Sequence, residues 1–123
     1  MILPMDNNEL RKRTKAFALR VIRLVEALPR TRVADVIGGQ LLRCGTSVGA
    51  NYRAACRPKS PADFVAKMGI VEEECDESAY WMELLVEAGI MKVGRISSLM
   101  SEADEILAMV VASVKTARAR RRN

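Results

Sequence analysis

The residues with the clearest potential for chemistry are glutamates that repeat at helical spacing. Glu73, Glu74 and Glu77 form an E-E-x-x-E pattern, and Glu102 and Glu105 form an E-x-x-E pattern further along the chain. Carboxylates three or four residues apart share one helix face. Two antiparallel helices could therefore bring two such pairs together around Mg²⁺, which binds oxygen ligands. The alternative is a solvated or salt-bridged helix face, which acidic runs commonly form.

The glutamate pattern resembles that of the all-α nucleotide pyrophosphohydrolases, in which E-E-x-x-E is followed by E-x-x-D. Here the second pattern ends in Glu105 rather than aspartate, and no lysines or arginines are obviously placed for a triphosphate. We keep a magnesium-dependent nucleotide hydrolase as a minor alternative, and we predict neither a resident metal nor another cofactor.

One residue type that many hydrolytic sites need is absent from this chain. It has no histidine, which removes Ser-His-Asp and Cys-His nucleophile systems and most zinc sites. The three cysteines, Cys44, Cys56 and Cys75, match no zinc spacing and are expected to be reduced. A cysteine on a core stripe behaves as a small hydrophobe. We therefore predict no catalytic residues and no enzyme.

Charge is distributed unevenly along a chain whose formal net charge is +5. Residues 1–59 carry 12 lysines and arginines against 4 acidic residues, whereas residues 60–91 carry one lysine against eight acidic residues. Residues 115–123 hold five basic residues and no acid. A basic surface favours an anionic partner, most obviously nucleic acid. The alternative is that pairing between helices and solubility account for these charges.

Four segments carry apolar residues at helical spacing, and none shows the alternation of a half-buried strand. They are 7–28, 32–56, 61–89 and 95–119, followed by a basic tail over 118–123. Four such helices with short links predict an all-α fold, an antiparallel up-down-up-down four-helix bundle that forms one domain over residues 1–123. No apolar run approaches the roughly 20 residues that cross a bilayer. We expect a cytoplasmic protein without a membrane partner.

Start and stop signals bound these segments. Thr31 is a plausible N-cap for the second segment, and Ser60 followed by proline is a strong start for the third. Asp6 or Asn7 is expected to cap the first segment. Gly89 is expected to end the third segment, because glycine readily adopts the left-handed conformation found after helix ends. The core stripe of the second segment is predicted to begin at Val33 or Val36. That of the third is predicted to contain Phe64, Met68, Val71, Cys75, Ser78, Met82 and Leu85.

The run LLRCGTSVGANYRAACR, followed by SPADFVAKMGIVEEECDESAYWMELL, carries a family resemblance. It resembles the bacterial four-helix bundle proteins, also called the 23S ribosomal RNA intervening-sequence protein family. The residues at matching places are Arg43, Ser47, Asn51, Phe64, Glu77, Tyr80 and Trp81. The resemblance covers about residues 8–118.

The resemblance implies an antiparallel four-helix subunit that assembles into a homopentamer. The relatives include the accessory protein of diversity-generating retroelements, a basic pentamer that binds nucleic acid and a reverse transcriptase. Nucleic acid and a protein such as a reverse transcriptase are therefore the partners that the resemblance implies. No defined activity is established for most members, and none is known to be an enzyme.

Small residues between Arg43 and Arg57 predict close helix packing, with a polar network beside it. Ser47 and Asn51 would form a short polar pair, and Glu73 or Glu77 on the next helix could accept hydrogen bonds from Asn51 or Arg43. We expect this network to fix helix register rather than to perform chemistry.

The leading hypothesis is a non-enzymatic, oligomeric bundle that binds nucleic-acid phosphates through basic helix faces, as an accessory factor to a nucleic-acid-processing partner. A protein-interaction scaffold is the alternative. The predicted nucleic-acid-binding residues are Arg11, Lys12, Arg13, Lys15, Arg20, Arg23, Arg53, Arg57, Lys59, Arg118, Arg120, Arg121 and Arg122.

Overall fold

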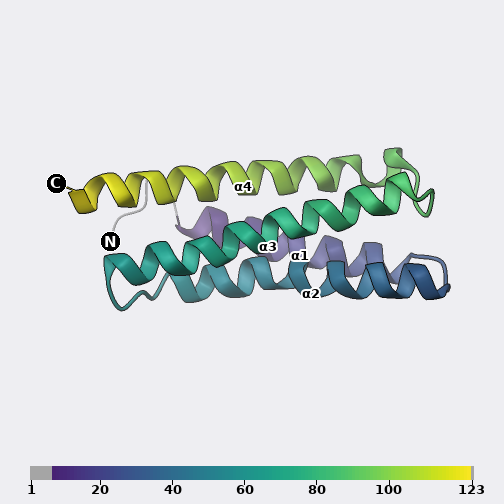
Figure 1. Ribbon diagram of the computed structural model, residues 1–123, viewed down its shortest axis with the longest axis horizontal. Coiled ribbons are helices and arrows are strands. Elements are labelled where there is room, and N and C mark those ends of the chain that lie inside the picture. The colour runs from purple at the N-terminus through teal and green to yellow at the C-terminus, as the bar shows by residue number, and fades with distance from the viewer. Residues whose placement is uncertain (1–6, 123) are drawn as a thin grey trace.

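Four long helices account for almost all of the chain (Figure 1). The computed structural model describes residues 7–122, with the side chains of residues 7, 121 and 122 excepted. The helices are α1 (Asn7–Glu26), α2 (Arg32–Ala55), α3 (Pro61–Glu87) and α4 (Val93–Arg122). No strand occurs between residues 7 and 122. The predicted all-α, up-down-up-down four-helix bundle is confirmed.

The helices pack as a ring in which each contacts two neighbours. The pairs α1–α2, α2–α3 and α3–α4 pack extensively, whereas α1 and α4 meet along a much sparser seam. The α2–α3 turn and the C-terminal end of α4 lie at one end of the bundle, and the α1–α2 and α3–α4 turns lie at the other (Figure 1). In the described part of the chain, no helix is long and apolar enough to span a membrane.

Capping side chains set the helix starts that the sequence predicts. Thr31 Oγ1 accepts a hydrogen bond from Ala34 N at 3.2 Å, and Ser60 Oγ accepts one from Asp63 N at 3.0 Å. These caps satisfy amide groups that have no partner within their own helix. Gly89 has φ of +72° just beyond α3, which is the left-handed conformation that glycine adopts most easily. The predicted cap Asp6 lies outside the described residues.

Several helix ends differ from the prediction. Helix α2 ends at Ala55 rather than 56, and α3 ends at Glu87 rather than 89. Helix α1 ends at Glu26 rather than 28, since Pro29 disfavours helical geometry in the residue before it. Helix α4 begins two residues earlier than predicted and continues through the basic tail to Arg122. Val114 and Ala117 are 5% and 6% exposed, so packing supports the last turns of α4 close to that tail.

All seven residues of the core stripe predicted for α3 are buried, but the start of the α2 stripe is corrected. Val33 and Val36 are 56% and 60% exposed, and Ala34 and Gly38 take the buried positions instead. The reason is space. A Cβ on Gly38 would lie 2.9 Å from Leu28 Cδ1, in the turn that follows α1, so a larger side chain there would have to displace Leu28.

Three buried glycines on α2 let α1 approach closely. Besides Gly38, a Cβ on Gly45 would lie 2.9 Å from both Cγ atoms of Val21. A Cβ on Gly49 would lie 3.2 Å from Thr14 Oγ1 and 3.3 Å from the Thr14 carbonyl oxygen. Gly45 and Gly49, which form a G-x-x-x-G pattern in the sequence, therefore face α1, and their role is packing.

Replacing Gly45 by alanine tests this close approach. The clash with Val21 should cost about 1–3 kcal/mol, partly offset by the better helix propensity of alanine. Gly39→Ala is the matched control, because Gly39 is exposed on the same helix with open space at its Cβ position. We expect G39A to stabilise the protein by about 0.5–1 kcal/mol. Urea unfolding of both variants measures the difference, and equal stabilisation would refute tight α1–α2 packing at Gly45.

Candidate nucleic-acid interface

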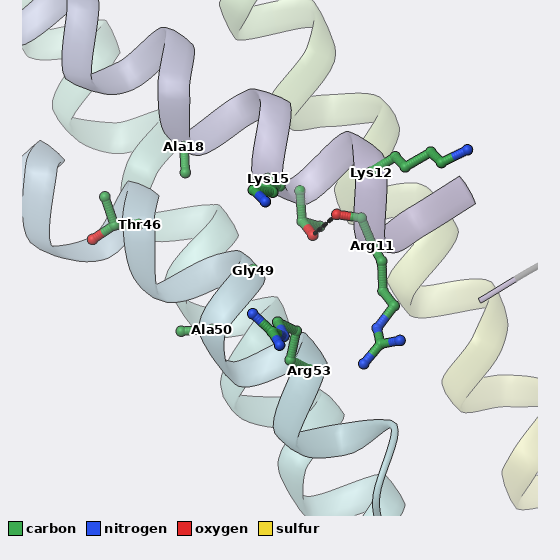
Figure 2. Close-up of a pocket in the computed structure, with 9 residues that line it drawn as sticks. Arg11, Lys12, Lys15, Ala18, Thr46, Gly49, Ala50 and Arg53 are labelled. Carbon is green, nitrogen blue, oxygen red and sulfur yellow. Dashed lines mark hydrogen bonds between the residues drawn. The ribbon is translucent and has the colours of Figure 1, made fainter. Parts of the chain in front are cut away.

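A hollow of about 460 Å³ lies between the N-terminal half of α1 and the C-terminal half of α2 (Figure 2). It forms here because the antiparallel helices are held together by the contact between Thr14 and Gly49 at its base. We call this hollow the α1–α2 groove. It is lined by Arg11, Lys12, Thr14, Lys15, Ala18, Thr46, Gly49, Ala50 and Arg53.

Four of the predicted cations line the α1–α2 groove, and no acidic residue does. Lys15 from α1 and Arg53 from α2 flank the gap between the helices, Arg11 extends along it, and the end of Lys12 points away from it (Figure 2). None of the ion pairs among the described residues involves these four side chains. The groove therefore carries uncompensated positive charge.

The floor of the groove consists of small side chains. Ala18, Gly49 and Ala50 leave the cations standing above it, and Thr46 and Thr14 already donate to backbone carbonyls of their own helices. A phosphate group could thus reach the floor without displacing a bulky residue. The sequence analysis did not assign the floor residues to a binding site. The run of small residues between Arg43 and Arg57 was the signal that could have identified them.

Arg13, which was also predicted to bind nucleic acid, does not line the groove. It crosses the α1–α4 seam, where Nε and Nη2 donate to Glu102 at 3.0 and 2.7 Å. Nη2 also donates to Glu105 at 3.1 Å, and Nη1 contacts Met109 Sδ at 3.3 Å. Hydrogen bonds to Glu102 and then to Glu105 raise the pKa of Arg13 above its usual value. The charge of Arg13 is therefore paired with carboxylates of its own subunit.

The other predicted cations fall into two groups. Arg20 and Arg23 line a different hollow towards the far end of α1. Arg57 and Lys59 are exposed in the α2–α3 turn, at the end of the bundle where α4 carries exposed Arg118. Arg120 is also exposed, whereas the side chains of Arg121 and Arg122 lie outside the described part of the chain.

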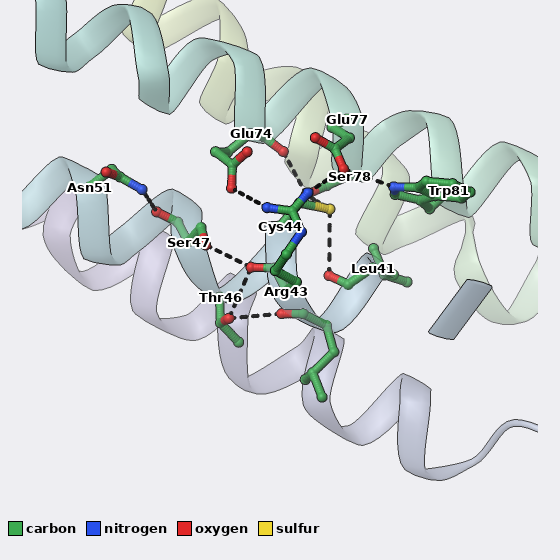
Figure 3. A network of polar contacts seen from close by, with 11 residues as sticks. Leu41, Arg43, Cys44, Thr46, Ser47, Asn51, Glu74, Glu77, Ser78 and Trp81 are labelled. Atoms are coloured by element: carbon green, nitrogen blue, oxygen red, sulfur yellow. Dashed lines mark hydrogen bonds and ion pairs between the residues drawn. The ribbon is translucent and has the colours of Figure 1, made fainter. Parts of the chain in front are cut away.

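A polar network joins α2 to α3 around Arg43 (Figure 3). The guanidinium donates to Glu74 Oε2 at 3.1 Å and to Glu77 Oε2, and Trp81 Nε1 donates to the same Glu77 oxygen at 3.1 Å. The predicted partner Glu77 is present, but Glu73 is exposed and Glu74 takes its place. The pKa of Glu77 is lowered, first by Trp81 and then by Arg43.

Ser47 and Asn51 belong to a chain of bonds within α2. Of the two side chains predicted to reach a glutamate of α3, Arg43 does so, whereas Asn51 bonds within its own helix. Ser47 Oγ donates to the Arg43 carbonyl at 2.7 Å, and Asn51 Nδ2 donates to the Ser47 carbonyl at 2.9 Å. Such bonds to the preceding turn satisfy polar side chains locally. The glutamates of α3 are therefore reached from α2 by Arg43.

The two glutamate patterns turn towards different neighbours, which removes the geometry that a magnesium site needs. Glu74 and Glu77 face Arg43 on α2, and Glu102 and Glu105 face Arg13 on α1. Within the described residues, no group of three or more potential metal ligands is assembled. The salt-bridged alternative therefore describes both patterns.

Two of the three thiols are buried in the core. Cys75 Sγ lies 3.3 Å from the Ala103 carbonyl, and Cys44 Sγ lies 3.3 Å from Ser78 Oγ. Burial raises the pKa of Cys75 to about 12 and also raises that of Cys44. A thiol with a raised pKa is a poor nucleophile. Both behave as packing residues.

Comparison with known proteins agrees with the resemblance read from the sequence. Residues 6–112 match the family model described as 23S rRNA-intervening sequence protein. Among solved structures, the chain is similar to a protein of unknown function from the S23 ribosomal protein family of Bacteroides thetaiotaomicron. The two share 32% sequence identity with a TM-score of 0.84, over 90% of this chain and 99% of that one. No curated protein matches significantly.

The Arg43 network predicts a pH effect on stability. Because the pKa of Glu77 is lowered on folding, its stabilising contribution is full above the unfolded value of about 4.3 and is lost as the pH falls towards the folded value. Glu77→Gln should cost about 0.5–1 kcal/mol at neutral pH, since the network is partly exposed, and should flatten the loss of stability in acid. Urea unfolding at neutral pH and near pH 3.5 measures both.

Glu73→Gln is the matched control for this prediction. It removes the same charge from an exposed position of α3 that takes part in none of the ion pairs of the described residues. An E77Q protein with the stability and acid dependence of E73Q would contradict a structural role for the network.

Proposed function

The chain belongs to the 23S rRNA-intervening sequence protein family, and from its surface we propose a non-enzymatic, oligomeric bundle that binds nucleic-acid backbone. The observation that carries the proposal is the α1–α2 groove, in which Arg11, Lys12, Lys15 and Arg53 surround a floor of small residues without an acid. Phosphate is the anion that a row of unpaired lysines and arginines suits best.

The same groove argues for binding that is indifferent to base sequence. Phosphate contacts position a protein on nucleic acid, whereas base edges or stacked bases provide sequence information. No aromatic residue lines the groove, and Phe17, Tyr52 and Phe64 are buried in the core. Tyr80 and Trp81 lie on α3, which does not contribute to the groove. Affinity should therefore come mainly from charge.

Structured RNA is the first nucleic acid to test. The name of the family refers to 23S rRNA, and the structural relative belongs to the S23 ribosomal protein family. An accessory role beside a nucleic-acid-processing enzyme, such as a reverse transcriptase, rests on the family resemblance. It adds a protein partner to the proposal without changing the groove.

Exposed apolar residues on the other side of α2 support the oligomeric part of the proposal. Val33 and Val36 on α2 and Tyr80 on α3 are 56%, 60% and 52% exposed, and Trp81 is half-buried beside Tyr80. Because α2 and α3 are antiparallel neighbours, these residues lie towards the same end of the bundle. Such residues are suited to a subunit contact, and we expect the pentamer that the family resemblance implies.

The groove proposal predicts strongly salt-dependent binding. Fluorescence anisotropy with labelled structured RNA, duplex DNA and single-stranded DNA should give affinities that fall steeply between low and moderate salt. Lys15→Glu with Arg53→Glu should weaken binding at least about tenfold and reduce the slope of log affinity against log salt by about 2.

Arg30→Glu with Arg32→Glu is the matched control, because it makes the same change in net charge at exposed positions far from the groove. Equal losses from the two double variants would place binding elsewhere on the surface. An absence of binding to all three nucleic acids at low salt would favour the protein-scaffold alternative.

The oligomer proposal predicts a pentamer that depends on the exposed apolar residues of α2 and α3. Native mass spectrometry and light scattering should report five subunits, and Val36→Lys with Tyr80→Lys should yield a folded monomer. Leu19→Lys, at an exposed apolar position of α1, is the control and should leave the assembly intact. A monomeric wild-type protein would overturn this part of the proposal.

A further inference from the structure

A second hollow, of about 270 Å³, lies between the C-terminal half of α1 and the beginning of α4. We call it the α1–α4 hollow. It is separate from the α1–α2 groove, since no residue lines both, and it lies nearer the opposite end of α1. Three arginines line it, Arg20 and Arg23 from α1 and Arg95 from the first turn of α4.

The three arginines are not neutralised within the subunit. None of them takes part in an ion pair among the described residues. Arg20 Nη2 donates to Ser98 Oγ at 2.9 Å, a neutral partner that positions the guanidinium across the seam. The nearby Glu102 is occupied by Arg13, and the first turn of α4 contains no acid. Three like charges around one small hollow favour an anion between them.

The floor of the hollow is apolar. Met91 and Leu99 are 8% and 4% exposed, and half-buried Leu24 completes the surface with Ala27. A bare inorganic anion would leave this floor uncovered. A ligand that joins an anion to a flat or apolar group would use both the arginines and the floor, as small-molecule sites generally do.

We propose that the α1–α4 hollow binds a phosphate monoester, with its phosphate among Arg20, Arg23 and Arg95 and its organic group on Leu24, Met91 and Leu99. Guanidinium groups bind phosphate with paired hydrogen bonds, which a doubly charged monoester can accept from several arginines at once. The volume suits a group of nucleotide size rather than a duplex. A free mononucleotide and the 5′-phosphorylated end of a strand both carry such a monoester.

Isothermal titration calorimetry of the full chain with AMP, adenosine and inorganic phosphate tests whether the hollow binds a phosphate monoester. AMP should bind saturably and more tightly than phosphate, and adenosine should not bind. Arg95→Gln and Arg23→Gln should each weaken AMP at least about tenfold, as expected for the loss of a charged hydrogen bond. Lys92→Gln is the matched control, an exposed cation beside α4 that does not line the hollow. Equal affinity of K92Q and R95Q would overturn the proposal.

A second comparison distinguishes a free nucleotide from the phosphorylated end of a strand. If the ligand is a strand end, an oligonucleotide with a 5′-phosphate should bind more tightly than the same strand with a 5′-hydroxyl. The R95Q variant should then abolish that difference. Binding of AMP without any such preference assigns the hollow to a free nucleotide. Absence of both AMP binding and a 5′-phosphate preference would refute a monoester site.

These outcomes are distinguishable from failure of the groove. Lys15→Glu with Arg53→Glu alters the α1–α2 groove only, so it should leave AMP affinity unchanged. Loss of AMP binding in that variant would show that the anion binds in the groove instead, and would overturn the assignment to the α1–α4 hollow.

Discussion

The close approach of α1 to α2 is the constraint on which the rest of the structure depends. Gly38, Gly45 and Gly49 lie where a Cβ would come within 2.9–3.2 Å of Leu28, Val21 and Thr14, so a larger residue would require these neighbours to shift. Packing at this density brings Lys15 and Arg53 to the two sides of one groove. Like charges brought together in this way repel each other. Helix packing offsets that cost and leaves a surface where an anion relieves the repulsion.

The arginines of this protein divide by what they face. Arg13 and Arg43 each meet two glutamates on a neighbouring helix, and they tie α1 to α4 and α2 to α3. Arg11 and Arg53 meet none. A count of charge along the sequence treats these residues alike. Only the second kind retains a field outside the molecule that can attract a polyanion.

Much of the fold could be predicted from the sequence because the α3 and α4 stripes are regular and Thr31 and Ser60 have unambiguous capping roles. The start of the α2 stripe was predicted wrongly, because apolar spacing favours Val33 and Val36 over glycine. Only the position of α1 shows that the interface admits the smaller residues.

The sequence identified most of the cations of the candidate site, but not which of them lie together on the surface. Helical periodicity places Arg11 and Arg13 two residues apart on different sides of α1, yet it does not say which side meets Glu102. The same limit explains why the sequence predicts Glu73 as a partner and misses Glu74. The rotation of α3 against α2 brings Glu74 to Arg43 and leaves Glu73 exposed. Arg95 had no signal of its own, since its significance comes from Arg20 and Arg23 across the seam.

The two hollows follow from one packing preference. Glycines draw α1 towards α2, and on its other side α1 meets α4 along the sparsest seam of the ring. Long side chains bridge that seam: Arg13 reaches Glu102 and Glu105, and Arg20 reaches Ser98. Where the bridging side chain finds a carboxylate, the seam is closed by an ion pair. Where it finds only a hydroxyl, the positive charge remains and the space beside it stays open, which is the condition for an anion site.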